Sequence, residues 1–296
     1  MLEKSPIEGK LLGKQVDYPS TYSPDILVAV PRFLNRSQYA IDEKELPFTG
    51  YDVWHAYEAS FLTNKGLPVA GVLKIIYPAN NPVIVESKSL KLYLNSFNME
   101  RFGDNPVEGV IEYKKIIQAD LAKLLQTKDV KIELFQTQPG HLPYDFHGYK
   151  VLETLHGADQ VTFEHFTDSP QLLKTDYDRP AELRLATHLL RSNCKITKQP
   201  DWGSAFIHIK SAVTPNFMSI LEYIVSLRNE NHFHEEICEM LFVRLMKAYN
   251  PEQLMVSCIY TRRGGIDICP VRASHPFLIP GSLTAHDTLS HKLLRQ

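Results

Sequence analysis

The sequence predicts an α+β protein in which one arrangement of strands and helices occurs twice. Residues 71–136 contain an apolar strand-like run, a short helix, a long amphipathic helix and a second strand-like run. Residues 204–260 repeat that order about 130 residues later. A segment rich in proline, glycine, aspartate and tyrosine joins the two copies. We therefore expect two β-α-α-β modules, one in residues 1–150 and one in residues 151–296.

In the first module, residues 72–78 (VLKIIYP) predict a strand and residues 89–97 (SLKLYLNSF) a short helix. Pro106 opens a longer amphipathic helix over residues 107–126, and residues 130–136 (VKIELFQ) predict the closing strand. The apolar residues at helical spacing in the long helix are Val110, Ile111, Ile117, Leu121, Leu124 and Leu125. The opposite face is rich in Glu, Lys and Gln, so this helix should lie on the surface of a core.

The second module has the same elements in the same order. Residues 205–210 predict a strand, residues 218–230 and 234–249 two helices, and residues 253–260 a strand. The connection, residues 138–180, should contain short strands or loops because its apolar residues need cover.

Residues 1–65 predict an extended arm, with VPRFLNR at residues 30–36, followed by one helical segment in residues 46–62 (LPFTGYDVWHAYEASFL). A further helix is expected to end at Cys194, which would place this thiol in a loop. The sequence contains no Gly-x-Gly-x-x-Gly, so it gives no support for a Rossmann dinucleotide site.

The composition excludes several classes of protein. With 296 residues and 44% hydrophobic content the chain can form a large core. A net charge of −2 favours a small-molecule partner over nucleic acid or an anionic membrane. We find neither a signal peptide nor a membrane span and expect a cytoplasmic protein. Four cysteines without CxxC spacing argue against disulfides and a cysteine-based zinc site.

Cys194 and Asp201 form the most informative pair of residues. A thiol with polar neighbours, followed seven residues later by a carboxyl group, can act as a nucleophile with its own proton source. The pair makes most sense if Asp201 carries a proton, which requires a pKa raised by burial, for example against Trp202. The alternative is that Cys194 is a buried apolar side chain, which is how we interpret Cys238, Cys258 and Cys269.

Three other segments carry candidate binding residues. Ser87 and Lys88 begin a helix and could hold an anion, although a helix cap with a solvated lysine would look the same. Glu235 could accept two hydrogen bonds from an amidine-like edge such as that of guanine, or it and His234 could simply begin a helix. Arg263 and Gly264 suit a phosphate, as would an ordinary basic turn.

A zinc site at His232 and His234 is also conceivable. No third ligand at a recognisable spacing accompanies them, and HExxH is absent, so we predict no metal site.

Together, residues 86–98 (ESKSLKLYLNSFN), 192–204 (SNCKITKQPDWGS), 226–236 (SLRNENHFHEE) and 260–270 (YTRRGGIDICP) resemble the NADPH-dependent 7-cyano-7-deazaguanine reductases. These are the nitrile reductases of queuosine biosynthesis. The resemblance is to the long, two-module form and extends to VPRFLNR and GLPVAG near the N-terminus. It implies tandem tunnelling-fold (T-fold) modules, in which antiparallel sheets backed by helices form a barrel on oligomerisation.

The resemblance also implies a role for each motif. Cys194 matches the nucleophile that forms a covalent thioimide, and Asp201 matches the acid that protonates the nitrile nitrogen. The implied substrate-binding residues are Val85, Glu86, Ser87, His234 and Glu235. The implied NADPH contacts are Ser87, Lys88, Arg263 and Gly264. The N-terminal module would carry the Glu-Ser-Lys-Ser motif and the C-terminal module the catalytic pair, so both would build one site.

The implied reaction reduces 7-cyano-7-deazaguanine to its primary amine with two hydride transfers from NADPH. We expect a homo-oligomer, specifically a dimer, that makes no direct contact with nucleic acid or membrane. Two alternatives are a cyclohydrolase-like T-fold enzyme acting on a purine or pterin and a non-catalytic purine-binding module. His234 could relay protons or only bind substrate.

Overall fold

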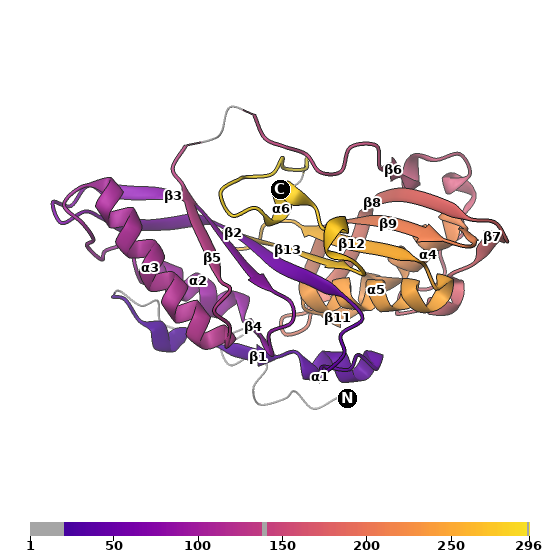
Figure 1. The fold of residues 1–296 in the computed structure, drawn as a ribbon, viewed down its shortest axis with the longest axis horizontal. Coiled ribbons are helices and arrows are strands. Elements are labelled where there is room, and N and C mark those ends of the chain that lie inside the picture. Colours follow the sequence, from indigo (N-terminus) through magenta and orange to yellow (C-terminus); the bar gives the residue numbers. More distant parts are fainter. Residues whose placement is uncertain (1–20, 138–140, 295) are drawn as a thin grey trace.

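The computed structural model describes residues 21–137 and 141–296, with the exception of Arg295 (Figure 1). The strands are β1 (Ala29–Pro31), β2 (Thr49–Leu62), β3 (Pro68–Pro78), β4 (Val83–Val85), β5 (Lys131–Phe135), β6 (Lys150–Val151), β7 (Thr175–Tyr177), β8 (Ala181–Cys194), β9 (Pro200–Ser211), β10 (Thr214–Pro215), β11 (Asn231–His232), β12 (Gln253–Tyr260) and β13 (Ile266–Ala273). The helices are α1 (Phe33–Arg36), α2 (Ser87–Asn95), α3 (Pro106–Leu125), α4 (Phe217–Ser226), α5 (His234–Tyr249) and α6 (Gly281–Thr284).

One large sheet organises the chain. Its strands run in the order β11-β8-β9-β12-β13-β2-β3-β5, and β6 pairs with β8 outside this path. All pairings from β8 to β5 are antiparallel, and they include the pairing of β13 with β2. Because β2 comes from the N-terminal half and β13 from the C-terminal half, this pairing joins the two halves into one continuous sheet. The predicted division at residue 150 remains a prediction.

Helices cover one face of the sheet, and alternation of side chains along the strands divides the core between the two faces. On β3, Ile75 packs with residues of α2 and α3, whereas Ile76 lies in a separate cluster on the other face. On β9, Ile207 packs with α4 and α5, and Phe206 belongs to the other face. The other face is covered by residues around Phe146 and by the C-terminal segment with the short helix α6, whose Leu283 belongs to the same cluster (Figure 1).

Most elements of the two β-α-α-β units are as predicted, and local side chains explain where their helices begin. Asn105 accepts hydrogen bonds from the amides of Val107 and Glu108 at the start of α3, and Asn216 accepts one from Ser219 at the start of α4. The coarse prediction of an α+β fold with antiparallel strands is therefore confirmed. Ile111 is an exception within α3, because its side chain is 60% exposed.

Two helix predictions are wrong. Residues 46–62 contain β2 and not a helix, and the segment before Cys194 forms β8. These two strands are counterparts in the two halves, and each forms a hairpin with the strand that follows it. Each also has a shift of register near its middle, between Ala56 and Ala59 in β2 and between Thr187 and Leu190 in β8. Such a bulge interrupts the two-residue alternation by which a strand is recognised.

The connecting segment forms short strands and 3₁₀ turns, as predicted, in its described part. The N-terminal arm is extended only in part, because α1 follows β1 directly. Among the described residues, none of the helices combines the length and the apolar character needed to span a membrane.

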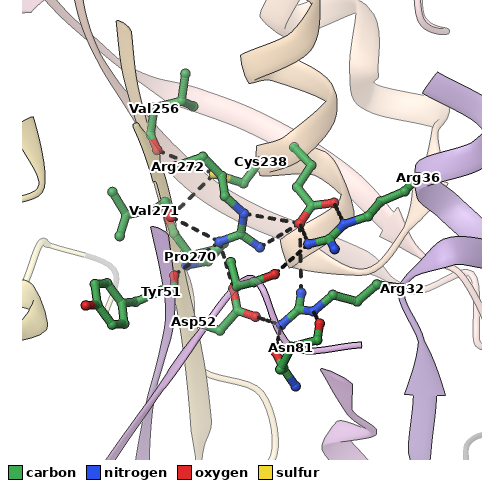
Figure 2. A network of polar contacts seen from close by, with 12 residues as sticks. Arg32, Arg36, Tyr51, Asp52, Asn81, Cys238, Val256, Pro270, Val271 and Arg272 are labelled. Carbon is green, nitrogen blue, oxygen red and sulfur yellow. Dashed lines mark hydrogen bonds and ion pairs between the residues drawn. The ribbon is translucent and has the colours of Figure 1, made fainter. Parts of the chain in front are cut away.

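A buried network of ion pairs attaches the arm to the rest of the fold (Figure 2). Glu239 of α5 accepts two hydrogen bonds from Arg36, at 2.8 and 3.0 Å, and one at 3.0 Å from Nη2 of Arg272 on β13. Asp52 of β2 pairs with Arg32 at 2.5 Å and with Arg272 at 2.9 Å. Burial raises the pKa of both carboxyl groups, but the guanidinium groups outweigh it and hold each pKa below its ordinary value. Both carboxyl groups are therefore ionised.

We expect Glu239→Gln to lower the free energy of unfolding by about 3–5 kcal/mol, because it leaves buried guanidinium charge uncompensated. Urea denaturation at neutral pH measures the change. The control is Lys210→Met, which breaks an exposed ion pair with Glu252 and should cost less than about 1 kcal/mol. Equal losses in the two variants would contradict a central role for the network.

Candidate functional site

A cavity of about 260 Å³ lies where elements of both halves meet. Strand β2, the end of β4 and the start of α2 come from the N-terminal half, and the β8–β9 hairpin, the start of α5 and the β12–β13 turn come from the C-terminal half. Its lining residues are Trp54, Val85, Ser87, Lys88, Lys91, Cys194, Gln199, Asp201, His232, Phe233, His234, Glu235, Arg263, Gly264, Ile266 and Ile268. Every residue that the sequence predicts for the site is among them except Glu86.

Cys194 is the last residue of β8 and is only 7% exposed. Its amide donates to the carbonyl of Gln199 at 2.8 Å, and its carbonyl accepts from the amide of Lys198 at 3.0 Å. Lys198 closes this turn with a left-handed backbone (φ 61°). On its other side β8 pairs with β11, where Cys194 lies opposite His232. The thiol is thus fixed by backbone pairing on both sides.

Asp201 is the second residue of β9, pairs with Ser192 on β8, and is 3% exposed. Its carboxylate is 3.4 Å from Nε2 of His234 and accepts a hydrogen bond from Arg263. Burial raises the pKa of Asp201, but the hydrogen bond to His234 and the nearby charges of His234 and Arg263 outweigh it and hold the pKa below its ordinary value.

This finding corrects the expectation that burial against Trp202 raises the pKa of Asp201. The neighbours of the Trp202 ring include the guanidinium groups of Arg191 and Arg228, which lie 5.8 and 5.1 Å from its centroid. The charge balance around Asp201 is instead set by His234 and Arg263. In this state of the protein Asp201 is an anion and must gain a proton before it can donate one.

His234 is the first residue of α5, and its ring stacks on Tyr260 with a centroid distance of 3.9 Å and an interplanar angle of 11°. This stacking and the Asp201 contact fix the imidazole through two different strands. Its Nδ1 is buried and has no hydrogen-bond partner among the described residues. The ring therefore has one nitrogen directed to the carboxylate and one available for a further contact.

Glu235 is the next residue of α5 and is 2% exposed. Burial, together with the negative charge of Asp52, raises its pKa to about 8. Its Oε1 has no hydrogen-bond partner within the described part of the chain. A buried carboxyl oxygen without a partner is costly unless something binds it, so Glu235 has the properties of a ligand-binding group.

The N-terminal half contributes the residues around the start of α2. Val85 ends β4, and Ser87 and Lys88 begin the helix. Glu86 is the N-cap residue: its carboxylate accepts a hydrogen bond from the amide of Ser89 at 3.2 Å, and it is 1% exposed. The assignment of Glu86 to substrate binding remains a prediction, and here its carboxylate caps the helix.

The sequence reasoning found the charged and nucleophilic residues but missed much of the cavity wall. Trp54 was not predicted as a site residue, because it lies in the segment interpreted as a helix. Phe233, the residue before His234, was not predicted either. His232 is held between Glu230 and Glu236, each at 3.2 Å. Although burial lowers its pKa, these two carboxylates outweigh burial and raise it to about 9. His232 is therefore a cation that fixes the turn before α5.

One group of side chains in the described regions has the spacing of metal ligands, and it lies away from this cavity. It contains His55, Asp267 and Cys269, all buried. Lys292 donates to Asp267 at 3.2 Å, so a cationic side chain already neutralises the carboxylate.

Comparison with known proteins shows the family to which the chain belongs. Residues 18–134 match the family model described as nitrile reductase, 7-cyano-7-deazaguanine-reductase N-term, and residues 200–276 match the model described as QueF-like protein. A relative from Colwellia psychrerythraea is 38% identical over 269 residues, which cover 89% of this chain and 91% of the relative. It is named NADPH-dependent 7-cyano-7-deazaguanine reductase. The chain belongs to this family.

Two further reductases of the same name support the assignment. The one from Coxiella burnetii is 39% identical over 267 residues, covering 90% of this chain and 91% of the relative. The one from Chromohalobacter salexigens is 40% identical over 269 residues, covering 90% and 92%. A likeness to the archaeosine synthase QueF-Like in the apo form covers 34% of this chain at 19% identity and a TM-score of 0.28, too slight to support an argument. Membership of the 7-cyano-7-deazaguanine reductases confirms the resemblance seen in the sequence and makes the chain an NADPH-dependent oxidoreductase.

Proposed function

We propose that this enzyme reduces the nitrile of 7-cyano-7-deazaguanine to the primary amine, 7-aminomethyl-7-deazaguanine, through a covalent thioimide on Cys194. The observation that supports this most strongly is the convergence of Cys194, Asp201 with His234, and Glu235 on one cavity. A nucleophile, an acid–base pair and a planar acceptor are the three functions that this reaction requires from the protein. The product would serve queuosine biosynthesis.

Glu235 binds the base. The guanine-like edge of the substrate presents two donors in one plane, and a carboxylate accepts both. Phe233 and Trp54 in the cavity wall supply apolar surface for the ring system. We assign Val85, Glu86 and Ser87 to substrate contacts as well, and Glu86 would then act while capping α2.

Cys194 carries the covalent step. The thiolate adds to the nitrile carbon, a C–S bond forms, and the electron pair displaced from the C≡N bond takes a proton at nitrogen. The resulting thioimide is a better electrophile than the nitrile. The C–S bond later breaks and returns the sulfur to Cys194 as a thiolate. NADPH, when bound, supplies two hydrides, and two protons complete the balance from nitrile to amine.

Asp201 and His234 supply the proton to the nitrile nitrogen. In the ligand-free site Arg263 pairs with Asp201 and favours its charged form. We also assign Arg263 to the phosphates of NADPH. A guanidinium drawn to a phosphate would remove part of the positive charge that lowers the pKa of Asp201, while the contact with His234 would remain. The pKa of Asp201 would rise as a result, so Asp201 would more readily take up the proton that it donates.

The basic residues in the cavity wall suit an anionic cofactor. Lys88, Lys91 and Arg263 line the cavity, and Gly264, with a backbone φ of 57°, lies beside Lys91. A Cβ atom at Gly264 would lie 3.3 Å from the side chain of Lys91, so glycine keeps this turn open and close to the cations. Ser87, Lys88, Arg263 and Gly264 are our assigned contacts to NADPH.

We also infer that the two halves, residues 1–150 and 151–296, are T-fold modules and that a barrel closes on oligomerisation. The enzyme would be a homodimer. It would act in the cytoplasm and make no direct contact with nucleic acid. The long antiparallel sheet backed by helices on one face supports this inference. Light scattering coupled to size-exclusion chromatography tests the assembly, and a monomeric mass would overturn it.

Mixing the enzyme with 7-cyano-7-deazaguanine in the absence of NADPH should add the mass of the substrate to the intact protein, and adding NADPH should discharge it. We expect no adduct in Cys194→Ala, because no other thiol lines the cavity among the described residues. Cys269→Ala removes a buried thiol elsewhere and should still form the adduct. No adduct in either the wild type or the control would favour the cyclohydrolase-like or the binding-module alternative.

Asp201→Asn should slow adduct formation and reduction by about 10²–10⁴-fold, because the amide cannot deliver the proton. Substrate affinity should change by only a few fold, since Asp201 does not bind the base. Single-turnover kinetics and equilibrium binding separate the two quantities. A large loss of affinity at an unchanged rate would assign Asp201 to binding.

Substrate binding should tighten as the pH rises toward 8. Glu235 has a pKa of about 8 and is mostly protonated at lower pH, whereas the base requires the carboxylate. The dissociation constant should therefore fall up to about tenfold per pH unit below 8 and level off above it. Measuring the binding of substrate to Cys194→Ala isolates the non-covalent step. In the double variant that also carries Glu235→Gln, the dissociation constant should no longer depend on pH. A flat profile in Cys194→Ala alone would contradict the assignment of Glu235.

A further inference from the structure

The segment VPRFLNR contains a buried side chain to which the proposed mechanism gives no role. Arg32 and Arg36 of this segment are engaged in the buried ion network. Asn35 lies between them on α1 and is 1% exposed. Neither its Nδ2 nor its Oδ1 has a hydrogen-bond partner among the described residues. Because a buried amide without partners is costly, an apolar residue would be the cheaper choice if Asn35 only filled space.

Asn35 lines a small chamber that shares Glu235 with the main cavity. The chamber has a volume of about 10 Å³ and is lined by Pro31, Arg32, Asn35, Ile84, Glu235, Glu236 and Glu239. This volume is roughly what one water molecule needs, and the lining offers several polar partners. Glu235 lines both this chamber and the main cavity, so this residue adjoins both spaces.

Two of the three carboxyl groups at the chamber are already engaged. Glu236 binds His232, Lys195 and the amide of Phe233, and Glu239 binds Arg36 and Arg272. In the third, Glu235, Oε1 has no hydrogen-bond partner in the described part of the chain, and the same holds for both polar atoms of the Asn35 amide. The two groups that need a hydrogen bond therefore line the same water-sized space.

We propose that Asn35 is a positioning residue for Glu235: one water molecule in the chamber joins the Asn35 amide to Oε1 of Glu235 and holds the carboxylate in the plane that receives the base. This proposal rests on the function assigned above to Glu235. A further hydrogen bond at Oε1, which has no partner among the described residues, would fix the orientation of the carboxyl group. It also favours the charged form, which is the form that accepts two donors from the substrate.

The other groups around Glu235 set its titration together with Asn35. They are Asp52 on β2, Tyr77 on β3, Arg32 in the arm, Arg272 on β13, and Glu236 and Glu239 on α5. Replacing Asn35 leaves all of these in place. A change in the pH at which substrate binding levels off can therefore be attributed to the lost amide as long as the fold is intact.

The test measures the affinity of Cys194→Ala for 7-cyano-7-deazaguanine as a function of pH, with and without a second substitution at residue 35. Asn35→Leu should weaken binding about tenfold at pH 7 and move the levelling-off point to higher pH. Asn35→Ser, which retains a hydrogen-bonding group, should recover affinity to within about threefold. Gln38→Leu, an exposed change just beyond α1, should have no effect. If the leucine variant does not fold, the same affinities are measured with Asn35→Val.

A double-mutant cycle distinguishes positioning from a structural role. If Asn35 acts through Glu235, Asn35→Leu should change affinity less than twofold once Glu235→Gln is present. Equal losses in both backgrounds, or a folded Asn35→Leu that binds like Gln38→Leu, would overturn the inference while leaving the proposed function intact. Failure of the Cys194→Ala protein itself to bind the base at any pH would overturn both.

Discussion

The buried pairing of Glu239 with Arg36 and Arg272 is the interaction on which the rest of the structure depends. It connects α5 to β13 on one side and to the N-terminal arm on the other. Asp52 extends it to β2 through Arg272 and Arg32. Since each charge is buried, none of these elements can shift without leaving a guanidinium or a carboxylate uncompensated. The network therefore fixes the helix whose first turn carries His234 and Glu235.

The site is a consequence of joining two similar halves in one sheet. The β13–β2 pairing places the turn with Arg263 and Gly264 against α2, which brings Lys88 and Lys91 from the other half. Among the described residues that line the cavity, the N-terminal half contributes Lys88 and Lys91, and the C-terminal half contributes Cys194, Asp201, Glu235 and Arg263. The chemistry of the cavity therefore depends on the contact between the halves, and the ion network stabilises that same contact.

Sequence reasoning was most successful where a residue's chemistry is tied to a short motif. Cys194 and Asp201 could be paired from their spacing, and the structure gives the reason: they lie on the two strands of one hairpin, whose register sets Ser192 opposite Asp201. Strands β2 and β8 could not be recognised, because a bulge in each breaks the alternation of apolar residues. Because the segment that forms β2 was predicted as a helix, Trp54 was not predicted to line the site. Asn35 could not be interpreted at all, because its role depends on a chamber formed by distant segments.

The two carboxyl groups of the cavity show why ionisation could not be predicted from the motifs. Asp201 and Glu235 are almost equally buried, at 3% and 2% exposure, so burial alone would raise the pKa of both. Asp201 differs because His234 and Arg263 bring positive charge against it, whereas Asp52 adds negative charge near Glu235. The partners come from α5 and the β12–β13 turn in one case and from β2 in the other. Which carboxyl group is ionised is therefore decided by tertiary contacts, so two side chains of the same chemistry have different charge states within one cavity.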